Sequence, residues 1–383
     1  MNRLITIILA FAAMSTIGQM RTAPEIAADI SAGWNLGNSL EAYSDSCVDA
    51  ETAWHNPRVN FDILDSVAAA GFDAIRIPVR WYPHFHDDGH VITIDDDWLA
   101  RVKEIVDHCI FVNDMYVILN THHEHWLENH PFYCDSAEVF AKEARLWTAI
   151  ADAFADYDDR LLFAGTNEVH VTDDWNEPCQ EYADVQNGFN RVFVETVRTT
   201  GGKNSERVLI VQTYGCNSYY GPKYLIVPDD SAVGRLMVEV HFYDPYQYCA
   251  AGTDLYFGKP FKQYGISSSL QENYIDYIFN RLKSLYTDIG LPIVLGEYGA
   301  QRYFDTNVES PMLDSRRYYY DYLIRTARRC GAVPFVWDNG YCGIGADRFG
   351  LFDRRTGAVV DRATLETIIE ASQEPLLNVS SSE

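Results

Sequence analysis

Residues 116–126 read YVILNTHHEHW, four apolar residues followed directly by a polar segment rich in histidine. The run 116–119 is apolar at every position, not at alternate positions. Such runs are typical of strands that are covered on both faces, as the strands of a parallel sheet are. An amphipathic stretch follows at 137–154, so the local pattern is strand, polar loop and helix.

The same pattern recurs along the chain from residue 32 onward. Eight apolar runs carry it: 32–36, 74–77, 116–119, 161–164, 208–211, 236–240, 293–295 and 333–336. The helical candidates between them are 61–70, 98–113, 137–154, 184–199, 270–289 and 315–330. Gly71, Gly290 and Gly331 directly follow three of these segments, where a helix-ending glycine belongs.

Eight buried strands alternating with helices predict an α/β fold, a (β/α)8 TIM barrel with extended loops after its strands. The longest of these loops are expected at 37–60 and 244–269. An open doubly wound sheet is the alternative, but no G-x-G-x-x-G opens the first helix. No linker divides the chain, so we expect one domain at 19–375 and a polar tail at 376–383.

Residues 1–18 have the composition of an export signal. A short basic start is followed by an apolar run at 4–14 and by the small residues Thr16 and Gly18. The run is shorter than the roughly 20 apolar residues that span a bilayer. We therefore expect a cleaved signal peptide, no membrane span, and a secreted or periplasmic protein; a helix retained in the fold is the alternative.

The composition excludes several classes of partner. The chain carries 30 Lys plus Arg against 55 Asp plus Glu, a formal net charge of −25. A protein this acidic does not neutralise phosphates, which argues against nucleic acid, and it favours a neutral polysaccharide over an acidic one. A hydrophobic content of 47% excludes a disordered chain. The oligomeric state is not readable from the residues, and a monomer is our working expectation.

Eight cysteines in an exported chain make disulfides plausible, but their pairing is not readable. Six fall in segments expected to be loops and would supply any bridges: Cys47, Cys134, Cys179, Cys216, Cys249 and Cys342. Cys109 and Cys330 lie in helical segments. Free buried thiols are an equally good interpretation.

Polar side chains gather where the predicted strands end. The set is Asn35, Arg76, His122, His123, Asn167, Glu168, His241, Tyr243, Glu297 and Trp337. In a barrel of this kind the carboxyl ends of the strands carry the chemistry. Burying so many polar groups is costly unless they serve a ligand or one another, so the set predicts a functional site.

Two carboxylates stand out, because Glu168 and Glu297 follow the fourth and seventh strands and can face each other across the barrel mouth. Paired carboxylates are the apparatus of glycoside hydrolysis, in which one protonates the leaving oxygen and the other attacks the sugar or activates water. Arg76 is a plausible cationic neighbour of Glu297. This favours Glu297 as the charged nucleophile and Glu168 as the acid.

From GWNLGNSLEA to PFVWDNG the chain resembles glycoside hydrolase family 5, the cellulase-type family of clan A barrels. The matching positions are Asn167 and Glu168, Glu297, Arg76 in R-I-P-V, His122, His241 with Tyr243, and Trp337. GWNLGNSLEA, ETAWHNP and NTHHEHW further resemble its bacterial endoglucanases and xyloglucanases. The resemblance implies a retaining, endo-acting hydrolase of β-1,4-glucan (cellulose, mixed-linkage glucan or xyloglucan) that needs no cofactor or metal.

The resemblance also implies roles. Glu297 would form the glycosyl-enzyme, Glu168 would be acid and then base, and Asn167 would bond the 2-hydroxyl of the sugar. Arg76 and Tyr243 would orient the nucleophile, and His241 would contact the acid. The remaining expected substrate-binding residues are Trp337 as the floor of the subsite, His122, His123 and Asn35. The family commonly has Pro after Asn-Glu, whereas this chain has Val169 and His170, which puts the leaving-group side in doubt.

Other interpretations stay open. An endo-β-1,4-mannanase would share the catalytic set. A non-catalytic glycan-binding barrel could use the same aromatic platforms, for which the candidates are Trp34, Trp54, Trp81, Trp126 and Trp175. A zinc site is conceivable at His122, His123, Glu124, His125 and His130, and a calcium site at the acidic runs 87–88 and 95–97. The first strand ends in Asn-Leu-Gly and lacks the His-x-His of the barrel metallohydrolases, which argues against zinc.

Overall fold

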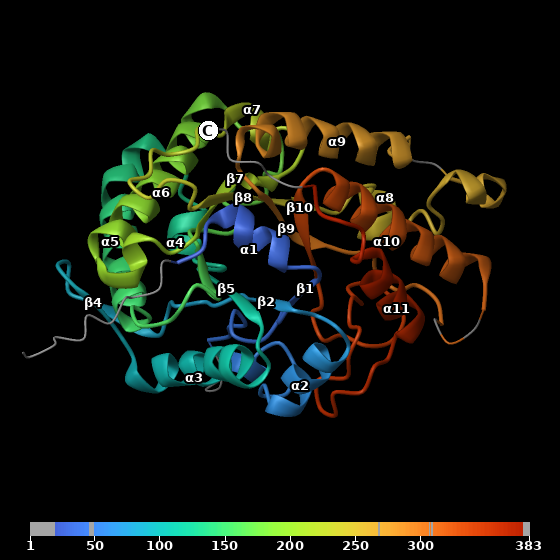
Figure 1. Ribbon diagram of the computed structural model, residues 1–383, viewed down its shortest axis with the longest axis horizontal. Helices are drawn as coiled ribbons and strands as arrows, with labels where there is room; N and C mark the ends of the chain where they lie inside the picture. The colour runs from blue at the N-terminus through green and yellow to red at the C-terminus, as the bar shows by residue number, and fades with distance from the viewer. Residues whose placement is uncertain (1–19, 46–49, 267–268, 306, 308, 378–383) are drawn as a thin grey trace, which may run out of the picture.

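The computed structural model describes residues 20–45, 50–266, 269–305, 307 and 309–377. Within these ranges eight parallel strands close into a barrel in the order β1-β10-β9-β8-β7-β6-β5-β2 (Figure 1). The barrel strands are β1 (Gly33–Asn35), β2 (Ala74–Ile77), β5 (Tyr116–Asn120), β6 (Leu161–Ala164), β7 (Leu209–Asn217), β8 (Leu236–Phe242), β9 (Ile293–Tyr298) and β10 (Ala332–Val336). Each predicted apolar run overlaps one of these strands, so the (β/α)8 barrel is confirmed.

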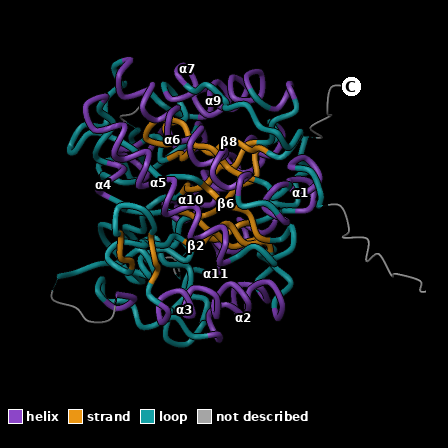
Figure 2. Tube along the Cα trace, turned by 90° about the vertical axis from the view of Figure 1, so that its left-hand side faces the viewer, coloured by secondary structure: helices purple, strands orange, loops and turns teal. Residues whose placement is uncertain are grey.

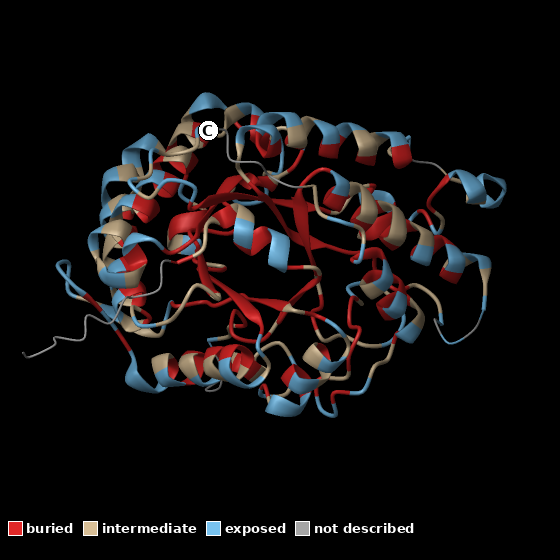
Figure 3. Cartoon of the chain, in the orientation of Figure 1, coloured by how far each residue is buried: buried red, intermediate tan, exposed pale blue. Residues whose placement is uncertain are grey.

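Helices surround the barrel and turn their buried faces inward (Figure 3). Six correspond to predicted segments: α2 (Phe61–Ala69), α3 (Asp96–Asp107), α5 (Tyr133–Ala153), α6 (Gln180–Thr199), α9 (Glu272–Leu285) and α10 (Pro311–Arg329). Five more were not predicted: α1 (Ala23–Asp29), α4 (His125–Glu128), α7 (Gly221–Tyr224), α8 (Tyr246–Cys249) and α11 (Arg362–Ala371). The predicted helix-ending glycines Gly71, Gly290 and Gly331 have φ of 106°, 93° and 82°, as a left-handed C-terminal residue requires.

Helix α1 closes the amino-terminal end of the barrel, across whose centre it lies in Figure 1. It starts with a capping box in which Glu25 Oε2 accepts from the backbone N–H of Thr22 at 2.7 Å. Ile26 of α1 and Ile30, which directly follows the helix, pack in one core with alternate strand residues such as Ile118 and Leu162. The other strand face packs against the helices in a second, larger core. With one end of the barrel closed, the polar carboxyl ends of the strands form the opposite mouth.

The loops at the mouth are long, as predicted. In its described part the segment between β1 and α2 holds a short 3₁₀ turn (Ala50–Thr52), and the segment after β8 holds α8 and a 3₁₀ turn (Lys259–Tyr264). An unpredicted hairpin of β3 (Phe85–Asp87) and β4 (Ile92–Ile94) extends from the loop after β2, and Figure 2 shows it as a separate pair of strands beside the barrel. Asp87 in this hairpin pairs with Arg145 of α5 at 2.7 Å.

The seven cysteines of the described ranges are all free thiols. Three of the six cysteines expected in loops lie in helices or strands instead: Cys134 in α5, Cys216 in β7 and Cys249 in α8. Cys47 lies outside the described residues, as do the proposed signal peptide and most of the tail. No helix in the described part of the chain has the length and apolar character needed to cross a membrane.

Candidate active site

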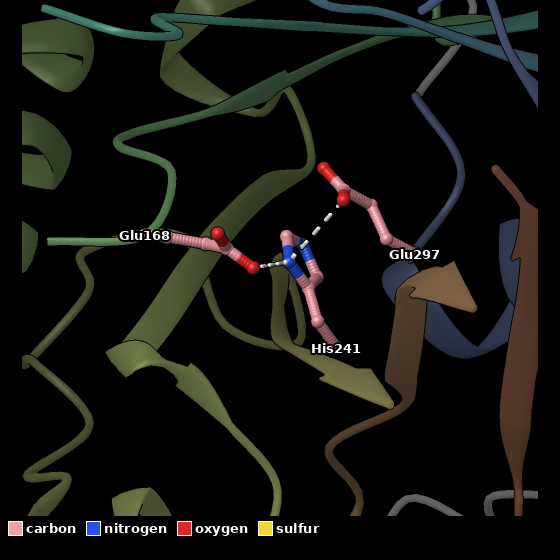
Figure 4. Close-up of side chains that lie close together, drawn as sticks. All are labelled: Glu168, His241 and Glu297. Atoms are coloured by element: carbon pink, nitrogen blue, oxygen red, sulfur yellow. Dashed lines mark hydrogen bonds and ion pairs between the residues drawn. The ribbon is translucent and has the colours of Figure 1, made fainter. Parts of the chain in front are cut away.

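Three side chains from the ends of different barrel strands lie close together (Figure 4). Glu168 follows β6, His241 is in β8 and Glu297 is in β9. One carboxylate oxygen of Glu168, one of Glu297 and a ring nitrogen of His241 all lie within 4.8 Å of one another. His241 Nδ1 lies 2.7 Å from Glu168 Oε1 and 3.7 Å from Glu297 Oε2. The two predicted carboxylates therefore share one site, and the imidazole lies between them.

Two donors hold the carboxylate of Glu297. Arg76 Nη1 donates to Oε1 at 2.9 Å, and the hydroxyl of Tyr243 donates to Oε2 at 3.0 Å. Arg76 also donates to Asn167 Oδ1 at 2.7 Å and to Asn35 Oδ1 at 3.0 Å. This arrangement fixes the orientation of the Glu297 carboxylate.

Asn35 and Arg76 are fully buried at the barrel mouth. The amide of Asn35 donates to the backbone carbonyl of Gly296 at 2.8 Å and to two carbonyls of β10. The guanidinium of Arg76 donates from Nη1 and Nη2 to side chains of the protein, and its Nε forms an ion pair with Glu239. Both side chains contact protein groups that line the mouth, and whether they also bind substrate stays a prediction.

His122, Asn167 and Trp337 line the mouth beside the carboxylates. The amide of Asn167 lies 3.4 Å from His122 Nε2, and Asn120 lies 3.2 Å from His122 Nδ1. The ring of His122 is parallel to that of the half-buried Trp337, with a centroid distance of 6.3 Å and an angle of 9°. Burial and the nearby His123 lower the pKa of His122 well below its usual range, so His122 is neutral.

Aromatic rings extend the mouth on two sides. His123 packs edge-on against Trp54, with ring centroids 5.6 Å apart. His170, the second residue after Glu168, stacks on Trp175 with ring centroids 3.8 Å apart, and its Nδ1 contacts the backbone carbonyl of Glu168. Trp175 is 54% exposed. Of the other predicted platforms, Trp34 and Trp81 are buried in the core and Trp126 is partly buried against it.

Glu239 of β8 is a site residue that the sequence prediction missed. Its carboxylate is fully buried and lies 2.9 Å from Arg76 Nε and 3.4 Å from His241 Nε2. The amide of Gln212 donates to its other oxygen at 2.8 Å. A signal was present, because Glu239 interrupts an apolar strand two residues before His241 and must therefore point to the same side of the sheet.

The local charges set the pKa values of the three acids. At Glu297 burial outweighs the attraction of His241 and Arg76 and raises the pKa of the carboxyl. At Glu168 burial is outweighed by the hydrogen bond and charge of His241, which lower its pKa. At Glu239 burial is outweighed by Arg76 and His241, and the pKa is lowered to about 2. In the protein by itself the pair thus favours a proton on Glu297, opposite to the predicted division of roles.

The donor set also bears on the metal hypothesis. Among the described residues, the group that brings three metal-ligating side chains together is Glu168, His241 and Glu297, not the histidine cluster at 122–130 that was the alternative zinc site. The guanidinium of Arg76 lies 2.9 Å from Glu297 and would repel a divalent cation there. His130 is occupied by Asp135 at 2.9 Å. The arrangement suits acid–base and nucleophilic chemistry by carboxylates.

Comparison with known families agrees with this geometry. A family model described as cellulase, glycosyl hydrolase family 5, matches residues 39–343. The chain belongs to glycosyl hydrolase family 5. The match covers the strand ends that carry Asn167, Glu168, His241 and Glu297.

Several members of family 5 are similar over most of this chain. The xyloglucan-specific endo-β-1,4-glucanase BoGH5A of Bacteroides ovatus is 36% identical over 361 residues, which are 91% of this chain and 70% of that protein. Endoglucanase A of Ruminococcus albus is 34% identical and covers 94% of this chain and 92% of its own length. The solved B. ovatus GH5 xyloglucanase in complex with a XXXG heptasaccharide superimposes with a TM-score of 0.83 at 34% identity, over 92% of this chain and 77% of that one. A GH5-4 broad specificity endoglucanase from Ruminococcus champanellensis with bound cellotriose gives 0.82 at 31% identity, over 92% and 99%.

Proposed function

We propose that this family 5 chain is a retaining endo-β-1,4-glucanase in which Glu297 is the nucleophile and Glu168 is the acid and then the base. The observation that carries the proposal is the carboxylate spacing. Oxygens of Glu168 and Glu297 lie within 4.8 Å of each other. Retaining enzymes hold their carboxyl groups about 5–5.5 Å apart, whereas inverting enzymes need roughly 6.5–9.5 Å to admit a water molecule.

In the first step a carboxylate oxygen of Glu297 bonds to the anomeric carbon of the glucan. The bond from that carbon to the glycosidic oxygen breaks, and the proton of Glu168 passes to this oxygen, so the leaving chain departs with a hydroxyl group. In the second step Glu168 takes a proton from water, whose oxygen bonds to the same carbon. The ester to Glu297 breaks, and both carboxyl groups return to their starting states.

Substrate binding would determine which of the two carboxyl groups carries the proton before the reaction. The side chain of Glu168 is 25% exposed and that of Glu297 is 7% exposed. A sugar in the mouth therefore removes more water from Glu168, and loss of water raises the pKa of a carboxyl group. Glu297 keeps its donors Arg76 and Tyr243 when a sugar binds. The proton of the pair then moves to Glu168, as the acid step requires.

The groups around the two carboxylates would bind the sugar. Asn167 would contact the 2-hydroxyl, since its amide faces the mouth next to Glu168. Trp337 would lie under the pyranose ring, because the apolar face of a sugar stacks well on indole. His123 and Trp54 extend the surface beyond that subsite. None of these contacts requires a cofactor.

The backbone of the substrate is proposed to be β-1,4-glucan. Two relatives carry the printed names xyloglucan-specific endo-β-1,4-glucanase and endoglucanase, and a solved relative holds cellotriose. The net charge of −25 suits a neutral polymer. Mannan differs from glucan in the orientation of one hydroxyl group and is the competing substrate.

Glu297→Ala tests the reaction. The variant is expected to bind cello- or xylogluco-oligosaccharide and to lose at least about 10³-fold in kcat, because the covalent step has no nucleophile. Wild-type enzyme is assayed on xyloglucan, mixed-linkage glucan, carboxymethylcellulose and mannan, and the anomer first released is identified by NMR. Release of the α-anomer would show inversion, and wild-type turnover by Glu297→Ala would refute the assignment of the nucleophile. Exclusive cleavage of mannan would refute the substrate class.

We also propose export, on the basic start and apolar run of residues 1–18. Expression of the full chain in a bacterium with an outer membrane should give protein outside the inner membrane that begins near residue 19. An intact N-terminus in the mature protein would refute the proposed cleavage. The domain limits at 18 and 375 and the monomeric state also stay predictions.

A further inference from the structure

A third carboxylate lies beneath the two reacting ones. Glu239 is fully buried in β8, and a buried carboxylate is strongly destabilising unless opposite charge and hydrogen bonds compensate it. Glu239 has two cationic neighbours and one hydrogen-bond donor: Oε1 lies 2.9 Å from Arg76 Nε and 3.4 Å from His241 Nε2, and Oε2 accepts from Gln212 at 2.8 Å. Both cations that contact Glu239 also contact a reacting carboxylate.

The neighbouring strand leaves room for this side chain. Gly296 directly precedes Glu297 in β9, and a Cβ atom at that position would lie 1.9 Å from Glu239 Oε1. Such a distance is impossible, so any other residue at 296 would displace either the Glu239 carboxylate or the strand that carries Glu297. The position of Glu239 is therefore built into the backbone of the active site.

Only some of the groups around His241 carry a charge. The titratable groups that interact with it are Glu168, Glu239, Glu297, Cys216 and His122, while Arg76 and Tyr243 contact its partner Glu297. Burial raises the pKa of the Cys216 thiol to about 12, so this thiol is neutral. Burial also raises the pKa of Tyr243 and lowers that of His122, which makes both neutral. The charge balance thus involves Arg76, His241 and the three carboxylates.

These charges balance at both stages of the proposed reaction. Before cleavage Glu168 is protonated and Glu297 is ionised, and in the glycosyl-enzyme Glu297 is an ester and Glu168 is ionised. The reacting pair therefore always carries one negative charge, and Glu239 carries a second. Arg76 and a protonated His241 offset both. Without Glu239 the same centre has one excess positive charge, which His241 relieves by losing its proton.

We propose that Glu239 is a positioning residue whose negative charge keeps His241 protonated through both steps. A protonated imidazole donates from both nitrogens, to Glu239 from Nε2 and to Glu168 from Nδ1, whereas a neutral one donates from a single nitrogen. The donation to Glu168 Oε1 leaves its other oxygen free to carry the proton that the leaving oxygen receives. The role in the reaction rests on the proposed function, but the protonation of His241 does not.

Glu239→Gln tests the proposal by its pH profile. We expect kcat/KM at pH 8 to fall at least about tenfold below wild type but less than about threefold at pH 5, because His241 now loses its proton within the assayed range. Glu239→Asp retains the charge, so its kcat/KM at alkaline pH should fall over the same pH range as that of wild type. Glu143→Gln removes another buried carboxyl, on α5 and outside the site, and should leave the profile unchanged. A uniform loss at every pH in Glu239→Gln would reduce Glu239 to a structural role and overturn the proposal.

A spectroscopic readout separates this proposal from the proposed function. In protein labelled with ¹⁵N-histidine, the ring shifts of His241, assigned with His241→Gln, should report a protonated ring at pH 7.5 in wild type and a neutral ring in Glu239→Gln. A neutral ring in wild type, or a protonated one in the variant, would overturn the proposal even if glucan is cleaved. If no β-1,4-glucan is cleaved, the proposed function fails while this measurement still holds. If Glu239→Gln does not fold, Gln212→Met removes one donor from Glu239 and should shift the ring pKa in the same direction by less; no shift would count against the role.

Discussion

Buried carboxyl groups at the barrel mouth differ because their partners differ. Glu239 is paired with Arg76, and its pKa is lowered to about 2 even though burial opposes the charge. Among the described residues, no cation forms an ion pair with Glu128 of α4, and its Oε1 accepts the backbone N–H of His123 at 3.0 Å. Burial and the charges of Glu124 and Glu168 raise the pKa of Glu128 to about 8. Equal burial thus leads to opposite protonation states at neutral pH.

Glu128→Gln should make the protein less sensitive to alkaline pH. The pKa of Glu128 in the folded state, about 8, exceeds the unfolded value of about 4.3. Its contribution to stability is therefore full below about pH 4 and is lost as the pH rises toward 8. Gln retains the acceptor for His123 without the charge. We expect equal melting temperatures at pH 4.5 and an advantage of roughly 5 °C, about 2 kcal/mol, for the variant at pH 8.5 by calorimetry. If the melting temperatures of wild type and Glu128→Gln change equally with pH across this range, the high pKa of Glu128 is contradicted.

Helices α10 and α11 are joined by one buried ion pair. Arg316 of α10 is 1% exposed and Asp361, which precedes α11, is 0% exposed, and their side chains are in direct contact. Asp361 also caps α11, because its other oxygen accepts from the backbone N–H of Thr364 at 3.2 Å. Arg316 further donates to the backbone carbonyl of Ala300, close to the end of β9. The pair therefore connects the last helix to the strand that carries Glu297.

Two substitutions at Asp361 separate its two functions. Asp361→Ala removes the cap and leaves a buried guanidinium without its counter-ion, which we expect to cost about 3–5 kcal/mol of unfolding free energy. Asp361→Asn keeps an acceptor for Thr364 and loses only the charge, so its loss should be smaller by about 1 kcal/mol, the usual value of an N-cap. Urea unfolding measures both. Wild-type stability of the alanine variant would contradict the assigned role of the pair.

At the scale of the whole molecule the dominant electrostatic feature is the net charge of −25. A field of one sign repels anionic polymers and acts little on neutral ones, and salt screens it with a Debye length of about 10 Å at 0.1 M. The charge therefore distinguishes between substrates that share the same glucan backbone.

An ionic-strength series tests this distinction. Between about 20 and about 300 mM NaCl we expect kcat/KM on neutral mixed-linkage glucan or xyloglucan to change less than about twofold. On carboxymethylcellulose, which carries added carboxylates, the value should rise about threefold or more as screening increases. Equal responses of the neutral and anionic substrates would show that the global charge does not reach the substrate-binding mouth.

The success of the sequence prediction differed between elements for physical reasons. The barrel strands were found because strands covered on both faces must be apolar throughout, and the six helices between them because one face of each is buried. The short helix α1 was missed, since its seven residues show too little periodicity, although Thr22 and Glu25 form a capping signal. The β3–β4 hairpin was missed because each strand has three residues. The observed ends of the six helices differ by a few residues from the predicted ends.

The sequence by itself determined the order of strands and helices and the chemical groups that follow each strand, because burial dictates which residues are apolar and strand ends carry the rest. Only the tertiary structure decided which of those groups meet. It placed Glu168 and Glu297 on either side of His241, covered Asn35 and Arg76 completely, and brought Glu239 against Arg76. Distances between side chains from different strands depend on the closure and stagger of the barrel, and no local pattern in the chain encodes them.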